Sequence, residues 1–289
     1  MKLNLNPPVL SEITANPENF TFLRKIGVEN YQFIEPVGDE RYVGIIDLET
    51  TGFDASSEEI IEIGITIASY SPSLKQLVAI VDNYQCFEEP SKPIPADAVK
   101  VNGITDGMVQ GHHIDDQRVK RMLQACDFVL AHNAKFDRRF FDKRFPDMTN
   151  LGWCCSIADI DWYDKGYSSR SLEYLCMKSG FTYEAHRACS DTVATTVLLA
   201  TDPSYFAALI TASLMEWQLI IANNSPYAVK DQLSKADYDW ETDERVWYKL
   251  VTKSERNQEL EFLEATYANG ATEAIVRVID ASTRFKPLF

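Results

Sequence analysis

Two carboxylates stand one residue apart at the end of an apolar run. Asp47 and Glu49 close the nearly continuous apolar segment that starts at Tyr42. On a β-strand, residues i and i+2 point to the same face, so these two carboxylates project together. Like charges that are buried together repel each other unless a positive group lies between them. Hard oxygen ligands suit Mg²⁺ or Mn²⁺, so the pattern predicts a metal site; the alternative is a solvated strand end.

The segment Thr50-Thr51-Gly52-Phe53 follows this pair directly and predicts a tight turn with free backbone N–H groups. Such a turn could hold a nucleotide sugar while the projecting Phe53 ring stacks on a base. The alternative is an ordinary turn whose Phe53 side chain returns to the core.

Two further groups place histidine and aspartate at element ends. His132 and Asn133 lie at a predicted strand end, and Asp137 lies in the first turn of the next helix. His186 lies on a loop before a helix that carries Asp191 in its first turn. A loop histidine is free to accept a proton from water, and an imidazole pKa near neutrality suits that role. The alternative for both aspartates is ordinary stabilisation of a helix N-terminus.

The elements that must position these groups predict an α/β fold. Three strands joined by short connections form an antiparallel meander, and two more strands alternate with helices. The result is a mixed five-stranded sheet with antiparallel strands 1–3 and flanking helices. The predicted strands are Tyr42–Leu48, 59–70, Gln76–Phe87, Asp127–Ala131 and Trp153–Ala158, and the main helices are Asp116–Ala125, Lys135–Phe145, Ser171–Ser179 and Cys189–Ala200.

The chain divides into four predicted segments. Residues 1–38, which prolines interrupt, form an irregular N-terminal extension, and residues 39–203 form the main domain. Residues 204–224 form a connecting helix, because the run from Tyr205 to Ala222 is strongly apolar. Residues 225–289 form a small C-terminal α+β appendage with its own set of aromatic side chains.

Composition narrows the class of protein. The chain has 289 residues, 45% of them hydrophobic, which is enough for a sizeable core. The net charge of −15 argues against a sequence-blind binder of duplex DNA, but not against an enzyme that grips a short nucleic-acid end through metal ions. We expect no membrane segment and no signal peptide, and six cysteines without CxxC pairs indicate a cytoplasmic protein.

One helix carries a local excess of positive charge in this acidic chain. Its cations could guide a phosphate backbone toward the acidic groups, or they could form an ordinary solvated face. They are Lys135, Arg138, Arg139, Lys143 and Arg144.

The three groups together resemble the DEDDh family of 3′→5′ exonucleases, which includes RNase T and the proofreading epsilon subunit of bacterial DNA polymerase III. The family's first motif, DxETTG, matches Asp47, Glu49, Thr50, Thr51 and Gly52. Its second motif, HNxxFD, matches His132, Asn133, Phe136 and Asp137. Its third motif, HxxxxD, matches His186 and Asp191. The segment Val101–Thr105 looks like the family's VHGIT, with Asn102 in place of histidine and Ile104 at the matching position. The resemblance covers roughly residues 42–202.

The resemblance implies an RNase H-like fold and hydrolysis with two divalent ions, Mg²⁺ or Mn²⁺, about 4 Å apart. It implies that Asp47 bridges both ions, that Glu49 and Asp191 hold the first, that Asp137 holds the second, and that His186 is the general base. The product would be a nucleoside 5′-monophosphate from the single-stranded or frayed 3′ end of DNA. Implied substrate-binding residues are Thr50, Thr51, Gly52, Phe53, Ile104, His132, Asn133 and Phe136.

Two alternatives stay open from the sequence. One is an exoribonuclease of the same fold, because nothing in the sequence separates ribose from deoxyribose substrates. The other is a nucleic-acid-binding scaffold subunit, associated with a polymerase partner through the C-terminal appendage. The intact set of acids favours an enzyme over a scaffold.

Overall fold

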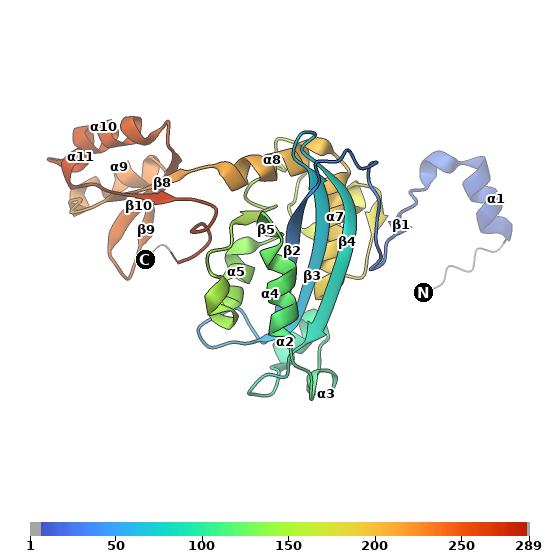
Figure 1. Ribbon diagram of the computed structural model, residues 1–289. Helices are drawn as coiled ribbons and strands as arrows, with labels where there is room; N and C mark the ends of the chain where they lie inside the picture. The colour runs from blue at the N-terminus through green and yellow to red at the C-terminus, as the bar shows by residue number, and fades with distance from the viewer. Residues whose placement is uncertain (1–6, 288–289) are drawn as a thin grey trace.

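The computed structural model describes residues 7–287, which form two main sheets and a short two-stranded one (Figure 1). The larger unit is built on a five-stranded sheet, and the smaller unit is built on a four-stranded sheet. Helix α8 (Pro203–Leu214) runs from the larger unit to the smaller one.

The five-stranded sheet has the order β4-β3-β2-β5-β6. Strand β2 pairs antiparallel with β3, and β3 pairs antiparallel with β4, whereas β5 pairs parallel with both β2 and β6. The predicted mixed sheet, with its antiparallel strands 1–3, is therefore confirmed. The strands are β2 (Arg41–Thr50), β3 (Ile60–Ser71), β4 (Gln76–Phe87), β5 (Phe128–Ala131) and β6 (Trp153–Cys155).

Helices cover both faces of this sheet, and alternation along β2 decides which side chain meets which layer. Ile46 and Leu48 pack with α4 (Asp116–Gln124) and α5 (Ala134–Arg144). Val43 and Ile45 point the other way, toward the layer of α6, α7 and α8. Asp47 and Glu49 lie two and four residues after Ile45, on the same face of the strand, so both carboxylates face α7.

The remaining helices of the larger unit are short or lie on the α7 side. Helix α6 spans Leu172–Lys178 and α7 spans Ala188–Ala200. The short helices α2 (Ala96–Asn102) and α3 (Asp106–Val109) lie at one end of the sheet (Figure 1).

Helix α7 lies directly on the backbone of β3. A Cβ atom built on Gly64 would come within 2.1 Å of the Ala188 carbonyl carbon and 2.3 Å of the Cys189 nitrogen. One turn later the hydroxyls of Thr66 and Thr192 are 2.7 Å apart and share a hydrogen bond. This close approach sets the height of the first turn of α7 above the sheet.

The smaller unit corrects one prediction. Residues Trp217–Ala222 form strand β8, which pairs antiparallel with both β10 and β11, so the predicted connecting helix over 204–224 is wrong beyond Leu214. A short apolar run is compatible with either a buried helix or a buried strand, and here the pairing with two later strands decides. The other predicted segment boundaries stay predictions. The sheet has the order β11-β8-β10-β9, with β9 at Asp239–Glu241, β10 at Val246–Thr252 and β11 at Ile275–Ile279; helices α9 (Lys230–Lys235), α10 (Arg256–Thr266) and α11 (Gly270–Glu273) complete the unit.

After β11 the chain returns to the larger unit. Residues 280–287, which we call the return segment, run beside α5 (Figure 1) and bond to β6. The Ala281 carbonyl accepts a hydrogen bond of 2.7 Å from the Trp153 backbone N–H on β6. The smaller unit is thus attached to the larger one at both of its ends.

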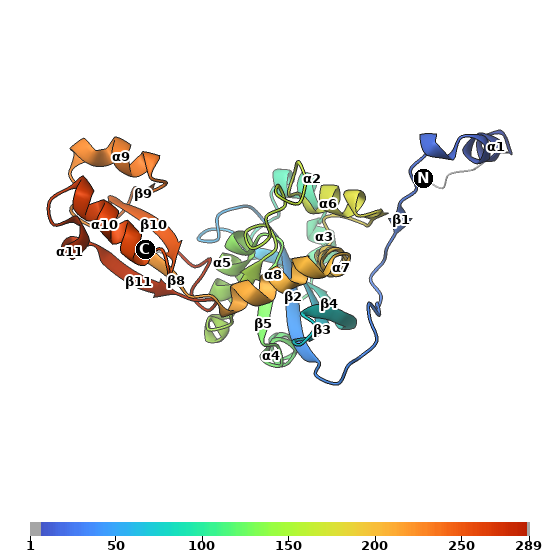
Figure 2. The same cartoon turned by 90° about the horizontal axis from the view of Figure 1, so that it is seen from above.

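The N-terminal extension is more ordered than its prolines predict. Helix α1 spans Pro7–Ala15, and β1 (Arg24–Lys25) pairs parallel with β7 (Phe181–Thr182). Gln32 then forms a bridge with Ala79 at the edge of β4. Figure 2 shows α1 at the opposite end of the molecule from the smaller sheet. Residues 1–6 of the predicted extension and 288–289 of the appendage lie outside the described residues.

Two features bear on the environment of the protein. Among residues 7–287, no single helix is long and apolar enough to cross a membrane, although α7 and α8 together, bent by 106°, reach that length and composition. All six cysteines are free thiols.

The contact between Gly64 and α7 makes a prediction about stability. Gly64→Ala forces the helix away from the sheet, because the atoms that its Cβ meets are backbone atoms that cannot rotate aside. We expect the free energy of unfolding in urea to fall by about 1–3 kcal/mol. Gly107→Ala is the matched control, because a Cβ there meets no atom within 4 Å. Equal stabilities for the two variants would contradict this account.

Candidate functional site

Three of the predicted acidic residues meet at the end of β2. The carboxylates of Asp47 and Glu49 project from the strand toward α7, and Asp191 projects back from the first turn of that helix. Each contributes an oxygen atom, and these atoms lie within 4.8 Å of one another. The structure therefore brings together residues that are more than 140 positions apart in the sequence.

The fourth acid, Asp137, lies beside this group. It is buried in the first turn of α5, and its Oδ1 accepts a hydrogen bond of 3.1 Å from the Leu48 backbone N–H. That bond ties the start of α5 to the strand residue between Asp47 and Glu49. Asp137 is outside the 4.8 Å group, although its charge is close enough to raise the pKa of Asp47.

Burial and mutual repulsion make these carboxylates hard to ionise. Burial, followed by the charges of Asp191, Asp137 and Glu49, raises the pKa of Asp47 well above its usual value. Burial is also the largest cause that raises the pKa of Glu49 to about 7, of Asp137 to about 8 and of Asp191 to about 6. A divalent cation placed among them would offset this repulsion, and their oxygen atoms are the ligands that Mg²⁺ and Mn²⁺ prefer. The residues present therefore fit a divalent metal ion.

Neutral hydrogen-bond donors fix the position of Asp191. The Tyr183 hydroxyl donates to its Oδ1 at 2.9 Å, and the Arg187 backbone N–H donates to its Oδ2 at 3.0 Å. Both contacts orient the carboxylate without adding a positive charge.

A fifth carboxylate, which sequence reasoning missed, lies behind the group. Glu62 is fully buried on β3 directly opposite Glu49, and its Oε2 accepts a hydrogen bond of 3.2 Å from the Ala188 N–H at the start of α7. The guanidinium of Arg187 lies 3.8 Å from that oxygen and donates to the Asn102 carbonyl at 2.9 Å. The available signal was a glutamate inside a run of buried isoleucines, since an acid is almost never fully buried without a partner.

Asn102 stands where the family pattern has histidine, and it contacts the site from α2. Its amide donates a hydrogen bond that lowers the pKa of Glu49, opposing the larger effect of burial. Its Oδ1 accepts from the Ile104 backbone N–H at 3.0 Å. Ile104 itself is fully buried against Ile61 and Val109, which leaves it no surface for the predicted substrate contact.

His186 is placed differently from the acids. It lies on the loop before α7 with a positive φ of 61°, and its side chain is exposed. Its charge lowers the pKa of Asp191, so the imidazole lies within electrostatic reach of the acidic group. The side chain is thus accessible to water beside the carboxylates.

The Thr-Thr-Gly-Phe segment bends the chain directly after β2, but the Thr51 backbone N–H is not free as predicted, because it donates to the Glu59 carbonyl at 2.9 Å. The Thr50 hydroxyl donates to the Gly52 carbonyl at 2.6 Å, and the Thr51 hydroxyl donates to Glu58 at 2.5 Å. Phe53 does not return to the core: 87% of it is exposed, and its ring meets the Phe136 ring edge-on at 6.4 Å. The turn therefore presents an aromatic face to solvent.

His132 and Asn133 end β5 in different environments. His132 Nδ1 lies 2.7 Å from the Ser156 hydroxyl and Nε2 lies 2.8 Å from the Arg170 carbonyl, so protein groups occupy both ring nitrogens. Burial lowers the pKa of His132 to about 4, which keeps the ring neutral. Only the carbon edge or face of this ring remains for a substrate. Asn133 is exposed at the start of α5.

The structure divides the cations of α5 into two sets. Arg138 is fully buried, Lys143 Nζ donates to the Ala55 carbonyl at 2.7 Å, and Arg144 forms an ion pair of 2.8 Å with Asp116. These three have structural partners, although Lys143 is itself exposed; among residues 7–287, the exposed cations of α5 that form no hydrogen bond or ion pair are Lys135 and Arg139.

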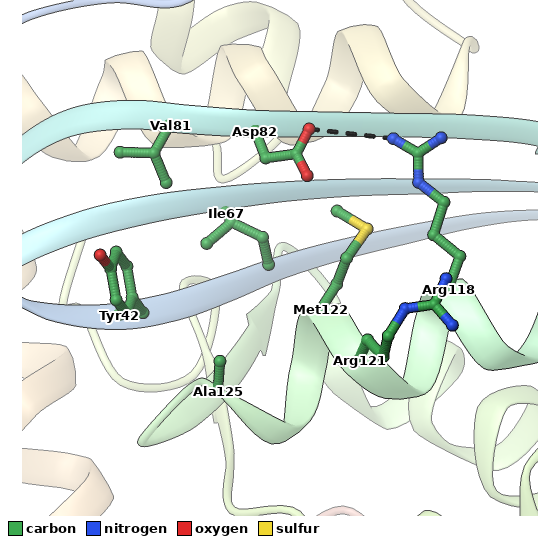
Figure 3. A pocket seen from close by; sticks show the side chains of 8 residues that line it. All are labelled: Tyr42, Ile67, Val81, Asp82, Arg118, Arg121, Met122 and Ala125. Atoms are coloured by element: carbon green, nitrogen blue, oxygen red, sulfur yellow. Dashed lines mark ion pairs between the residues drawn. The ribbon is translucent and has the colours of Figure 1, made fainter.

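A hollow of about 460 Å³ between α4 and β4 contains none of the predicted site residues (Figure 3). It lies beside Tyr42 at the start of β2, whereas Asp47 is five residues further along the strand, or roughly 16 Å. Arg118 reaches Asp82 across it at 3.9 Å, and Arg121 lies at its rim. The acidic group is therefore a separate site.

A family model described as the RNase T exonuclease family matches residues 45–199, which is just over half of the chain. The matched range contains Asp47, Glu49, Asp137, Asp191 and His186. The chain therefore belongs to this exonuclease family, and the resemblance to DEDDh exonucleases is confirmed.

Two curated relatives are polymerases. The chain is 30% identical over 170 residues to the DNA polymerase III PolC-type protein of Bacillus subtilis, which covers 56% of this chain and 11% of that protein. It is 35% identical over 112 residues to the protein of the same name from Clostridium perfringens, which covers 38% of this chain and 7% of that protein. The chain thus spans about a tenth of the length of the curated relatives it matches.

A solved structure of exonuclease I shares the fold. The two are 15% identical with a TM-score of 0.51, and the match covers 84% of this chain and 63% of that chain. The predicted RNase H-like architecture is confirmed by this likeness together with the strand order.

The raised pKa of Asp137 predicts how stability depends on pH when metal is absent. An unfolded aspartate loses its proton near pH 4, whereas folded Asp137 holds its proton up to about pH 8. Between these values the folded state binds more protons, so stability falls as pH rises. Asp137→Asn removes this ionisation and keeps an oxygen for the Leu48 N–H. We expect its melting temperature in EDTA to fall less than that of the wild type between about pH 5 and pH 8.

The matched control is Asp231→Asn, which removes an exposed carboxylate on α9 in the smaller unit. It should follow the wild-type curve. Parallel curves for the wild type and Asp137→Asn would rule out this source of pH dependence.

Proposed function

We propose that the protein is a metal-dependent 3′→5′ exonuclease that removes nucleoside 5′-monophosphates from single-stranded or frayed 3′ ends. One observation carries this proposal: carboxylates from β2, α5 and α7 converge beside an exposed histidine within a domain of the exonuclease family. All five positions of the family's catalytic set hold the expected residue types.

The carboxylates would hold two divalent ions, Mg²⁺ or Mn²⁺. Glu49 and Asp191 would bind the first, Asp137 would bind the second, and Asp47 would contact both. When bound, such ions stabilise the attacking and leaving oxygens of an in-line displacement at phosphorus. The hydrogen bonds from Tyr183 and the Arg187 backbone orient Asp191 for this role.

His186 would take a proton from the attacking water. Its loop position leaves the imidazole accessible to water beside the carboxylates. The turn at Thr50–Phe53 would hold the terminal nucleotide, with the exposed Phe53 ring stacked on its base and Phe136 supporting that ring.

The relatives favour DNA as the substrate, because both are DNA polymerase III proteins of the PolC type. The same similarity supports a polymerase partner and a role in proofreading or repair. An exoribonuclease of the same fold is the alternative that the assay must address. A cytoplasmic location also stays a prediction.

The main test incubates 5′-labelled single-stranded DNA and RNA oligonucleotides with the protein and Mg²⁺ or Mn²⁺. We expect a ladder of products shortened one nucleotide at a time, which EDTA abolishes. Asp47→Ala should remove the ladder, because that carboxylate is central to the acidic group. A wild-type protein that makes no ladder on either substrate, or an Asp47→Ala variant as active as the wild type, would refute the proposed function.

A second variant tests the role of the loop histidine. His186→Ala should lower kcat by about 10²–10⁴-fold, as expected for loss of a general base. Because the side chain is exposed, the melting temperature should stay close to that of the wild type. An unchanged kcat would remove His186 from the mechanism.

A further inference from the structure

A second hollow lies between the Phe53 turn, α5 and the return segment. Its volume is about 350 Å³, within the range of small-ligand sites. It is lined by Phe53, Asp54, Ala55 and Ser56 from the turn, Arg138, Arg139 and Asp142 from α5, and Lys286 and Pro287 from the return segment. We propose that this hollow, called here the upstream groove, binds the nucleotides that precede the 3′-terminal one, and that the return segment forms one of its walls.

Arg138 fixes that wall in place. Its guanidinium donates to the carbonyl oxygens of Ala281 at 3.2 Å and Arg284 at 2.6 Å, and it also donates to that of Ser282. Arg138 follows Asp137 directly on α5, so one turn of helix carries a proposed metal ligand and the clamp on the return segment. The wall therefore has a defined position relative to the acidic group.

Two further contacts anchor the same segment. Arg284 forms a buried ion pair with Asp159, and its guanidinium lies 4.6 Å from the centre of the Phe285 ring. The Trp153 backbone N–H holds Ala281 at the edge of β6. Lys286 and Pro287 follow immediately after these anchored residues, which places the Lys286 cation at the groove.

The charges in the groove suit a phosphate backbone. Its lining has three cations and two carboxylates, an excess of one positive charge in a chain whose net charge is −15. Asp142 forms an ion pair with Arg138 at 3.2 Å, and Asp54 accepts hydrogen bonds from Ser56. Within residues 7–287 the exposed Arg139 forms no hydrogen bond or ion pair. Lys286 lies close enough to Asp142 to lower the pKa of that carboxyl, which burial raises more strongly.

The position of Phe53 gives the groove its direction. The Phe53 turn continues directly from the strand that carries Asp47 and Glu49, and its largely exposed ring borders the groove. Lys143 holds the turn from α5 through the carbonyls of Ala55 and Ser56. A strand whose terminal base stacks on this ring would pass its preceding phosphates along Arg139 and Lys286.

The test compares substrates of two lengths, and it rests on the proposed function. The values of kcat/KM are measured for a dinucleotide and for an eight-residue oligonucleotide, in DNA and in RNA, over a range of salt concentrations. Arg139→Ala and Lys286→Ala should each lower the ratio of the long-substrate value to the short-substrate value by up to about fivefold. The double variant Arg139→Ala/Lys286→Ala tests both contacts together. For the long substrate, a plot of log kcat/KM against log salt concentration should have a slope that is shallower by about 1.4, because each lost phosphate contact contributes about 0.7.

Two controls accompany these variants. Lys286→Arg keeps the charge and should keep the wild-type ratio. Arg121→Ala removes an exposed arginine from α4, at the separate hollow in Figure 3, and should also keep it.

The outcomes separate the two proposals. The double variant could still hydrolyse both substrates with metal and keep the wild-type ratio of long-substrate to short-substrate kcat/KM and the wild-type salt dependence. That result would refute the proposed role of the upstream groove and would leave the proposed exonuclease function standing. If the wild type hydrolyses neither substrate, both the proposed function and the proposed role of the groove are refuted. An equal loss in Arg121→Ala would show that general surface charge, not the groove, sets the effect.

Discussion

Repulsion between carboxylates at the end of β2 is the constraint that the surrounding structure has to satisfy. The groups that hold these carboxylates are mostly neutral: a tyrosine hydroxyl and a backbone N–H on Asp191, another backbone N–H on Asp137, and an amide on Glu49. The nearest guanidinium, on Arg187, is directed to Glu62 and to the Asn102 carbonyl instead. The protein thus fixes the geometry of the acids and compensates their charge only in part, through His186 and Arg187. A site of this kind is preorganised for cations. The repulsion between its carboxylates destabilises the fold, and the buried contacts of the sheet with α5 and α7 offset that unfavourable free energy.

This arrangement also explains how an acidic protein can act on an acidic polymer. Part of the negative charge is concentrated where ions would offset it, and the excess positive charge of the upstream groove is confined to one short path. Substrate recognition would then depend on a few phosphates near the end of a strand and not on a broad basic face. Single-stranded ends fit such a site better than continuous duplex, because stacking on Phe53 requires an unpaired base.

Most of the fold and the acidic group could be predicted from the sequence because their signals are local. The apolar run before Asp47, the alternation of isoleucines on β3, and the acids in first turns each reflect the period of one element. The features that were missed are non-local. β8 is a strand only because β10 and β11 pair with it, and three of the backbone carbonyls that bind Arg138 lie more than 140 residues later in the chain. Glu62 had a local signal, a lone acid among buried isoleucines, but its partner at the start of α7 is visible only in three dimensions.

The Arg138 clamp has a consequence for how the chain can be divided. A shortened chain that ended after α8 would look like a complete exonuclease domain by its motifs. It would nevertheless lose three of the four backbone carbonyls that receive the Arg138 guanidinium, leaving only that of Thr149. Only the Thr149 carbonyl and the Asp142 carboxylate would then accept from Arg138, and a buried guanidinium that loses most of its acceptors destabilises the helix turn next to Asp137. The exonuclease domain and the smaller unit are therefore best regarded as one folding unit, although each has its own sheet and its own hydrophobic core.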